Sequence, residues 1–194
     1  MERGGTAMKK YAWNCFFDFE KEEAWLNRMS SKGYAFTRVF LGLLYTFKKC
    51  PPGKYIYRME MLKKHPTHKE SKEYLAFMAE AGAEVVDTAV ESWVYFRKEA
   101  SMGPFEIFSD IASLLGHYRR VAGFWLALLL LQFIICINGL RSNVDFLLGR
   151  SGPVDVFDLT LGIAAAVLGA AMFAAWIPTA KQIRKLKREQ MLHE

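Results

Sequence analysis

The sequence is poor in the side chains that staple small proteins or bind metals, with three cysteines and four histidines among 194 residues. Cys15, Cys50 and Cys136 are too few and too scattered for a disulfide framework, which favours a reducing compartment. His65 and His68 are three positions apart, but a proline separates them and no third ligand of matching character is near. We therefore expect capping or surface histidines, and no metal or other cofactor.

Patterns that carry chemistry are also missing. The chain has no glycine-rich phosphate loop, no nucleophile elbow and no zinc pattern. The acidic run of Glu20, Glu22 and Glu23 is explained by a helix N-terminus, where acidic groups complement the helix dipole. We expect a protein that is not an enzyme.

The positive charge is modest, with 26 Lys and Arg against 20 Asp and Glu. It does not form a stripe of the kind that binds nucleic acid, and the glycine and aromatic pattern of RNA-binding sheets is absent. We expect no nucleic-acid partner. The basic balance indicates attraction to anionic lipid or ordinary solubility.

Charge is absent from two long apolar stretches. Val121 to Leu140 is twenty uncharged residues, and at about 1.5 Å per residue it spans the roughly 30 Å hydrocarbon core of a bilayer. Leu159 to Ile177 is nearly as long and equally uncharged. Residues 121–177 therefore predict an α-helical transmembrane hairpin with membrane lipid around it.

The distribution of basic residues predicts the orientation of this hairpin. No signal peptide is expected, because the apolar run after Lys10 is broken by Asn14 and ends at Asp18. Arginines precede the first span and five basic residues follow the second, whereas the connecting loop has only two arginines, offset by three aspartates. We expect a multi-pass protein of the cell membrane with both termini in the cytosol.

Residues 10–100 predict one small α+β domain. Period-two alternation from Tyr11 to Phe19 indicates a strand with one strongly apolar face, followed by a helix that Asp18 caps and Gly33 ends. A strand follows at 34–41, and 43–49 is either another strand or its continuation beyond a bend. A Pro-Pro-Gly turn then returns the chain into a strand at 55–61.

A second helix opens at Thr67 and ends at Gly82, and a final strand covers 92–98. The apolar stripes of the two helices match at an offset of 49 residues, as in the pair Trp25 and Tyr74. Two such halves predict the ferredoxin-like order β-α-β-β-α-β, in which both helices cover one face of the sheet. The other face would be free for a protein partner, a ligand or a second copy.

Aromatic side chains occur on both phases of the predicted strands, so one face is expected to stay aromatic and partly uncovered. The candidate interaction surface consists of Phe36, Phe40, Tyr45, Phe47 and Tyr95. Its occupant would be an unidentified protein partner or a second copy of the chain.

Three stretches of this domain resemble a bacterial family known as domain of unknown function 2812. They are WNCFFDFEKEEAWLNRMSSKGYAF, LLYTFKKCPPGKYIYRMEML and ESWVYFRKE, within residues 10 to 99. The resemblance implies a cell-envelope protein in which a helical membrane segment follows the domain. It also implies a gene near that of a PadR-like transcription regulator, as is common for members of this family. The resemblance supplies no activity and no catalytic residues.

The remaining segments flank these two parts. Residues 1–9 are expected to form a disordered tail. Residues 101–120 predict an amphipathic juxtamembrane segment beginning at Pro104, or else an extension of the first span. Residues 178–194 form a basic cytosolic tail, which would grip anionic lipid or a partner, or would merely fix the topology.

The predicted spans contain polar and small residues that favour contact between the two helices. The candidate interhelix residues are Gln132, Asn138, Asp158, Gly162, Ala166 and Gly169. Small residues let helices approach closely, and a polar residue within a span is a functional candidate. Helix association explains these residues better than a transport pathway does.

The sequence therefore supports a membrane-anchored interaction or signalling module of the bacterial cell envelope. Its cytosolic sheet would present a surface to a protein partner. An alternative is a small accessory subunit of an envelope transporter, in which the polar residues of the spans matter most. A sensor that binds an apolar small molecule on the sheet is a third reading.

Overall fold

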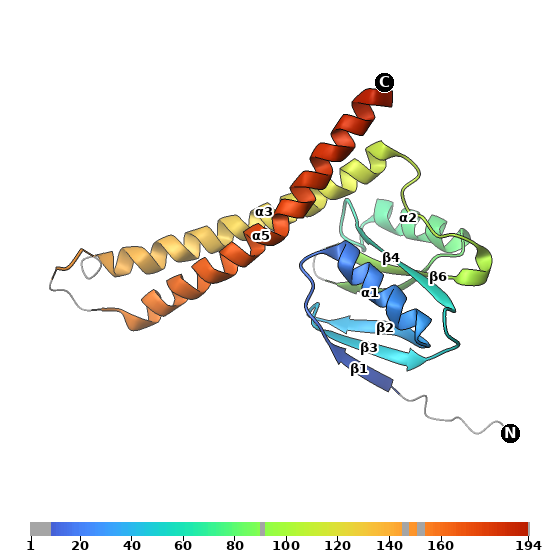
Figure 1. The fold of residues 1–194 in the computed structure, drawn as a ribbon, viewed down its shortest axis with the longest axis horizontal. Helices are drawn as coiled ribbons and strands as arrows, with labels where there is room; N and C mark the ends of the chain where they lie inside the picture. The colour runs from blue at the N-terminus through green and yellow to red at the C-terminus, as the bar shows by residue number, and fades with distance from the viewer. Residues whose placement is uncertain (1–8, 90–91, 145–147, 151–153, 194) are drawn as a thin grey trace. The chain divides into compact units, whose positions relative to one another are not determined.

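The computed structural model describes residues 9–89, 92–144, 148–150 and 154–193. The chain forms two compact units, Met1–Asp110 and Ile111–Glu194, which we call the α+β unit and the helical unit. The α+β unit holds two three-stranded sheets, and the helical unit holds two long helices (Figure 1). Apart from Lys9, the tail expected at 1–9 lies outside the described residues.

The α+β unit consists of two halves with the same order of elements. The first half is β1 (Lys9–Trp13), α1 (Phe19–Ser31), β2 (Tyr34–Phe40) and β3 (Leu44–Lys49). The second half is β4 (Tyr55–Met61), α2 (Lys69–Glu80), β5 (Glu84–Ala89) and β6 (Trp93–Glu99). Sheet A has the strand order β1-β3-β2 and sheet B has the order β4-β6-β5, so the last two strands of each half pair in the same way.

The offset of 49 residues extends from the helices into the strands. The register of sheet A shifts between Phe36 and Arg38, and that of sheet B shifts between Val85 and Asp87, which are the matching positions. The repeated unit is thus β-α-β-β. The prediction of a ferredoxin-like order was wrong because the chain contains β5, which the sequence patterns did not reveal, and because 44–49 is a separate strand.

Local signals explain where the helices begin and end. The Asp18 carboxylate accepts from the backbone N–H groups of Glu20 and Lys21, as predicted for the N-cap of α1. The cap of α2 is His68 and not Thr67, since the His68 ring accepts from the Glu70 N–H. Gly33 and Gly82 follow the two helices at φ 82° and 83°, in the left-handed conformation that glycine adopts most easily.

Two hydrophobic cores hold the unit together. The first lies between α1 and both sheets, with Leu26, Phe36, Tyr45 and Tyr95 among its members. The second packs α2 residues such as Met78 against the other face of β6, and it includes Leu62, Met78, Ala83, Val94, Phe96 and Phe105. Sheet B is therefore covered on both faces. The helices do not share one face of a single sheet, as the ferredoxin-like prediction required.

The segment after β6 does not form the predicted juxtamembrane helix. A short 3-10 turn, η1, occupies Ala100–Met102, and residues 103–110 adopt neither helix nor strand. The Phe105 side chain is buried in the second core. Residues 103–110 therefore belong to the α+β unit. Residues 111–120 form the first turns of α3, in line with the alternative of an extended first span.

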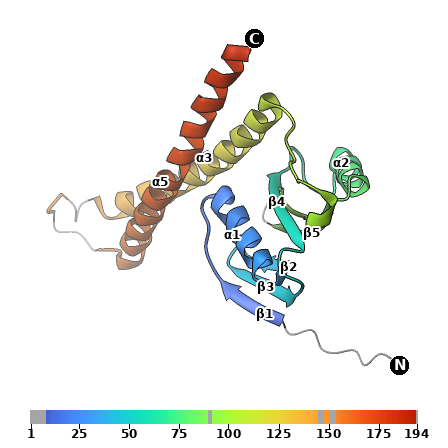
Figure 2. The ribbon, with the colours of Figure 1, turned by 45° about the vertical axis from the view of Figure 1, so that its right-hand side comes forward.

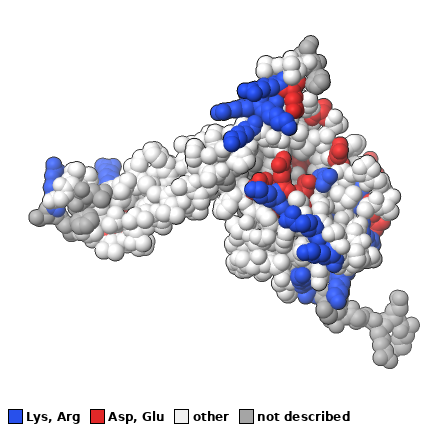
Figure 3. All heavy atoms as spheres, viewed as in Figure 1, with Lys and Arg blue, Asp and Glu red and all other residues white. Residues whose placement is uncertain are grey.

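The helical unit consists of α3 (Ile111–Ser142) and α5 (Val156–His193), which pack along each other. Both helices are long and apolar enough to cross a membrane. On the face shown in Figure 3, Lys and Arg gather at the two ends of this unit and leave its middle uncharged. α5 continues through Pro178, so the basic residues expected in a tail at 178–194 belong to this helix.

Candidate interaction site

The candidate surface predicted from the sequence is mostly core. Phe36, Tyr45 and Phe47 are fully buried and Tyr95 nearly so, because the side chains of β2, β3 and β6 that point toward α1 form the first core. Of the five candidates, only Phe40 is exposed, at 58%. The four buried residues hold the domain together and do not present an aromatic surface to a partner.

An exposed aromatic surface does exist, on the opposite face of sheet A. Trp13 pairs with Leu44, which also pairs with Phe40, so these three side chains lie in one row on one face. Tyr11 lies two positions from Trp13 and shares that face. Trp13 is 74% exposed and Tyr11 is 60% exposed. We call Tyr11, Trp13, Phe40 and Leu44 the aromatic face.

The alternation in β1 was correctly identified as a strand with one strongly apolar face. That face, which carries Tyr11 and Trp13, is exposed, whereas Ala12 packs against the first core. An edge strand with large aromatic side chains directed outward is a surface that proteins usually cover.

The turn beside the aromatic face is conformationally strained. Leu41 and Gly42 connect β2 to β3 with φ angles of 51° and 66°, and the Leu43 N–H donates to the Phe40 carbonyl. This two-residue geometry favours Asn or Gly, and a leucine in the left-handed region costs about 1–2 kcal/mol. The strained turn holds Leu41 in solvent at the end of the aromatic face.

Side chains of α1 cover the β4 edge of sheet B. The Asn27 side chain donates to the Tyr57 carbonyl at 3.0 Å and accepts from the Tyr57 N–H at 2.8 Å. Ser30 exchanges hydrogen bonds with the backbone of Tyr55 in the same way. The Glu23 carboxylate accepts from the Met59 N–H at 3.0 Å. One stripe of α1 thus takes the place of a neighbouring strand.

The β1 edge of sheet A, which we call the free edge, has no such cover among the described residues. The Asn14 N–H donates to the Leu43 carbonyl, so the even-numbered residues of β1 bond to β3. The backbone groups of Lys9, Tyr11 and Trp13 consequently point away from β3. The positions of α2 that match the α1 stripe are Lys72, Ala76 and Ala79. The two alanines carry no hydrogen-bonding side chain, so α2 does not repeat what α1 does for β4.

A buried carboxylate ties the two sheets together inside the unit. Glu22 is 7% exposed, and its Oε1 accepts from the Tyr45 hydroxyl at 2.7 Å and from the Tyr95 hydroxyl at 2.6 Å. Burial raises the pKa of Glu22, although both hydrogen bonds oppose this effect. Burial also raises the pKa of both phenols, so they remain protonated donors. Glu22 was expected only to complement the helix dipole; in the structure it is a cross-link within the core.

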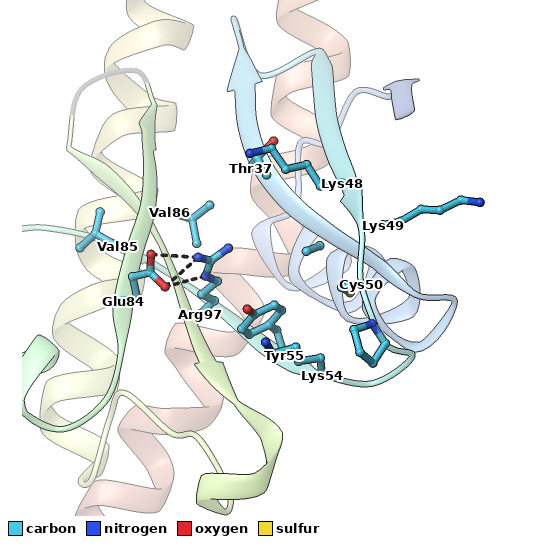
Figure 4. Close-up of a pocket in the computed structure, with 12 residues that line it drawn as sticks. Thr37, Lys48, Lys49, Cys50, Lys54, Tyr55, Glu84, Val85, Val86 and Arg97 are labelled. Atoms are coloured by element: carbon cyan, nitrogen blue, oxygen red, sulfur yellow. Dashed lines mark hydrogen bonds and ion pairs between the residues drawn. The ribbon is translucent and has the colours of Figure 1, made fainter. Parts of the chain in front are cut away.

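A pocket, which we call the basic pocket, lies where β2 and β3 face β5 and β6 (Figure 4). It encloses about 440 Å³ and is lined by Ala35, Thr37, Lys48, Lys49, Cys50, Pro51, Lys54, Tyr55, Glu84, Val85, Val86 and Arg97. Arg97 forms a bidentate pair with Glu84 at 2.8 and 2.9 Å and lies over the Tyr55 ring. With four cationic side chains and one carboxylate, the lining attracts anions.

In the described part of the chain, no three His, Cys, Asp or Glu side chains are arranged to hold a metal ion. Cys50 lines the basic pocket, but burial raises the pKa of its thiol and keeps it protonated.

The helical unit brings together some of the predicted interhelix residues. A Cβ placed on Gly139 would lie 2.8 Å from the Gly162 Cα, so the helix backbones approach most closely there. Gly169 faces Gln132, and Gly162 faces Gly139. Ala165 is buried and Ala166 is exposed, so Ala165 and not Ala166 faces α3 between these two glycines.

The polar residues near the helix ends are arranged differently from the prediction. Asn138 is exposed and lies outside the seam. Asp158 lies at the start of α5, where its backbone N–H donates to the Asp155 carboxylate. Near the loop end of the unit Asn143 is buried, at 1% exposed, and sequence patterns did not single it out. Its side chain donates to the Gly139 and Asp155 carbonyls and accepts from the Asp155 N–H, so it fastens the end of α3 to the start of α5.

Comparison with known proteins yields one family. The family model described as Protein of unknown function (DUF2812) matches residues 18–130, which is more than half of the 194-residue chain. The match runs from the N-cap of α1 into α3, and it confirms the resemblance predicted from the sequence. No curated protein and no solved structure matches the chain.

Proposed function

We propose that this chain, which belongs to the DUF2812 family, is a membrane-anchored interaction or signalling module of the bacterial cell envelope without enzymatic activity. Its α+β unit would lie in the cytosol and present sheet A to a protein partner. The aromatic face and the free edge of β1 are the surface that we assign to this role. They replace the buried aromatic residues that the sequence suggested.

The exposure of Trp13 carries this proposal. Trp13 stands in a row with Phe40 on a sheet face that no described element covers. In the second half the matching face is covered, because Tyr57, Met59 and Tyr95 pack into the first core. Exposed aromatic clusters on a folded domain commonly mark protein interfaces, where Trp and Tyr supply much of the binding energy.

The helical unit supports the membrane anchor. Both helices exceed the length needed to span a bilayer, and their charges gather at the ends (Figure 3). We propose that they form a two-span hairpin, with lipid around it and both chain termini on the cytosolic side. The basic residues from Lys181 to Arg188 near the end of α5 agree with this orientation.

A photoreactive amino acid at Trp13 tests the proposal in intact membranes. The matched control places the same amino acid at Phe77, an aromatic residue of α2 that is 63% exposed. The proposal predicts a defined protein adduct from position 13 and none from position 77. Equal labelling from both positions, or no protein adduct from position 13, would contradict it.

The second candidate function is a small accessory subunit of an envelope transporter. The position of Gln132 favours it, because a polar residue in the apolar stretch of a membrane helix can form hydrogen bonds with a neighbouring helix. Replacement of Gln132 by Leu should then abolish assembly with the transporter or export, whereas the same change at the exposed Asn138 should not. If both variants assemble and export normally, this candidate is excluded.

A further inference from the structure

We infer that the free edge of β1 pairs with β1 of a second copy of this chain. The two copies of sheet A would then form one continuous antiparallel sheet, with β1 beside β1 at its centre. This inference rests on the proposed function, because it names the partner that occupies the β1 edge of the proposed interaction surface.

The edge of β1 is prepared for strand pairing. The backbone N–H and C=O groups of Lys9, Tyr11 and Trp13 point outward, since the alternate residues bond to β3. In this chain the corresponding edge of sheet B is saturated by α1 at Tyr55, Tyr57 and Met59. The β4 edge is thus satisfied within the chain, whereas β1 lies at the edge of sheet A with its outer backbone groups available among the described residues (Figure 2). An added strand would satisfy it through main-chain hydrogen bonds.

The sequence of β1 is complementary to itself in one antiparallel register. With Tyr11 opposite Tyr11 of the second copy, all five residues of β1 are paired. Lys9 then faces Trp13, and Lys10 faces Ala12. A lysine beside an indole ring is a favourable cation–π pair, and no two like charges are opposed.

Neighbouring registers are less favourable. The backbone groups that point away from β3 belong to odd-numbered residues. The register can therefore move only in steps that keep odd residues opposite odd residues. One step toward the amino end would set Lys10 against Lys10 and leave Ala12 and Trp13 without partners in β1. One step the other way would leave Lys9 and Lys10 without partners in β1. Like charges directly opposite each other destabilise a sheet. Charge and pairing therefore select the register centred on Tyr11.

This arrangement also extends the aromatic face. The Tyr11 and Trp13 side chains of the two copies would line the same side of the continuous sheet, where the rings lie across the strands from one another. Two copies anchored in one membrane encounter each other at a raised local concentration, which helps a short edge form a stable pair. The pairing is isologous, so it closes after two copies and does not propagate.

Cysteine cross-linking of the full chain in membranes tests the register. In a background with Cys15, Cys50 and Cys136 replaced by Ser, Tyr11→Cys should form a disulfide dimer. Directly opposed residues of a hydrogen-bonded pair have Cα atoms about 5.5 Å apart, which suits a disulfide. Trp13→Cys should not link to itself, because its counterparts would be about 13 Å apart. A mixture of Lys9→Cys and Trp13→Cys chains should link.

A second pair of variants separates pairing from folding. Tyr11→Pro removes an outward N–H without removing a bond to β3, whereas Tyr11→Val keeps the N–H and strand preference. Cross-linking of Lys9→Cys with Trp13→Cys should fall at least tenfold in the proline background and persist in the valine background. Persistence in both, or self-linking at positions 11 and 13 alike, would overturn the inference.

The outcomes distinguish this inference from the proposed function. If cross-linking at position 11 captures a different protein and no second copy, self-pairing is refuted while the interaction module stands. If a photoreactive residue at Trp13 captures no protein, both are refuted.

Discussion

The Asn27 side chain exchanges two hydrogen bonds with the backbone of Tyr57, at 3.0 and 2.8 Å. These are the bonds that a neighbouring strand would otherwise form with β4. The Asn27 amide also donates to the Glu23 carbonyl, which fixes its orientation on α1. Because α1 belongs to the first half and β4 to the second, this contact joins the two halves. It also protects the edge of sheet B from pairing with another chain.

Replacing Asn27 by Ala should lower the free energy of unfolding by about 2 kcal/mol, since the backbone groups of Tyr57 lose their partners. Denaturant unfolding of the full chain in detergent measures this loss. Arg28→Ala is the matched control, because Arg28 is the next residue of α1 and is exposed; it should change stability by less than about 0.5 kcal/mol. Equal effects of the two substitutions would show that the Asn27 hydrogen bonds contribute nothing to the free energy of unfolding.

The buried carboxylate of Glu22 should make stability depend on pH. Burial raises its pKa above the ordinary 4.5, so the folded protein holds this proton to higher pH than the unfolded chain. The resulting stabilisation is complete below the unfolded pKa and is lost as pH rises through the folded pKa. As pH rises above the ordinary pKa of 4.5, wild type should therefore lose stability relative to Glu22→Gln. Parallel pH profiles for wild type and Glu22→Gln would contradict this account.

Relieving the strained turn should stabilise the domain. Leu41→Asn places a residue that tolerates the left-handed conformation at φ 51°, and we expect a gain of about 1 kcal/mol. The same substitution removes an exposed apolar side chain beside the aromatic face, so capture of a partner from position 13 should decrease. A variant that is less stable than wild type would show that the turn is not strained.

The close approach of α3 and α5 should tolerate no side chain at Gly139. A Cβ there would lie 2.5 Å from the Asp158 carbonyl oxygen, so Gly139→Ala should separate the helices and lower the thermal midpoint in detergent. Gly123 is the matched control on the same helix, because a Cβ at that position meets nothing within 4 Å. If both alanine variants melt at the same temperature, the contact does not contribute to stability.

Local patterns in the sequence predicted most elements but not how they cover one another. The N-cap at Asp18, the repeat of 49 residues and the strand at β1 were all visible in residue order. The β4 edge is covered because three α1 residues contact a strand about 30 positions later in the chain. The spacing of apolar residues predicts helices and strands but not contacts between distant ones. For the same reason, Tyr45 could not be recognised as core and Trp13 could not be recognised as surface.

Two further differences have local causes. β5 was missed because Asp87 and Thr88 interrupt its short apolar run, although Asp87 is needed there: its carboxylate accepts from the Val39 N–H at 2.7 Å. The juxtamembrane helix was overestimated because Phe105 recurs at helical spacing with later residues, while in the structure it fills the second core.

Hydrogen exchange at two adjacent amides tests the central claim most directly. The Ala12 N–H faces β3, whereas the Tyr11 N–H faces the free edge. In native membranes, where the docking partner is present, we predict slow exchange at both amides. In the purified, diluted chain we predict that Tyr11 exchanges quickly while Ala12 stays protected. Fast exchange at Tyr11 in both states would mean that nothing docks on the β1 edge, and it would contradict the account.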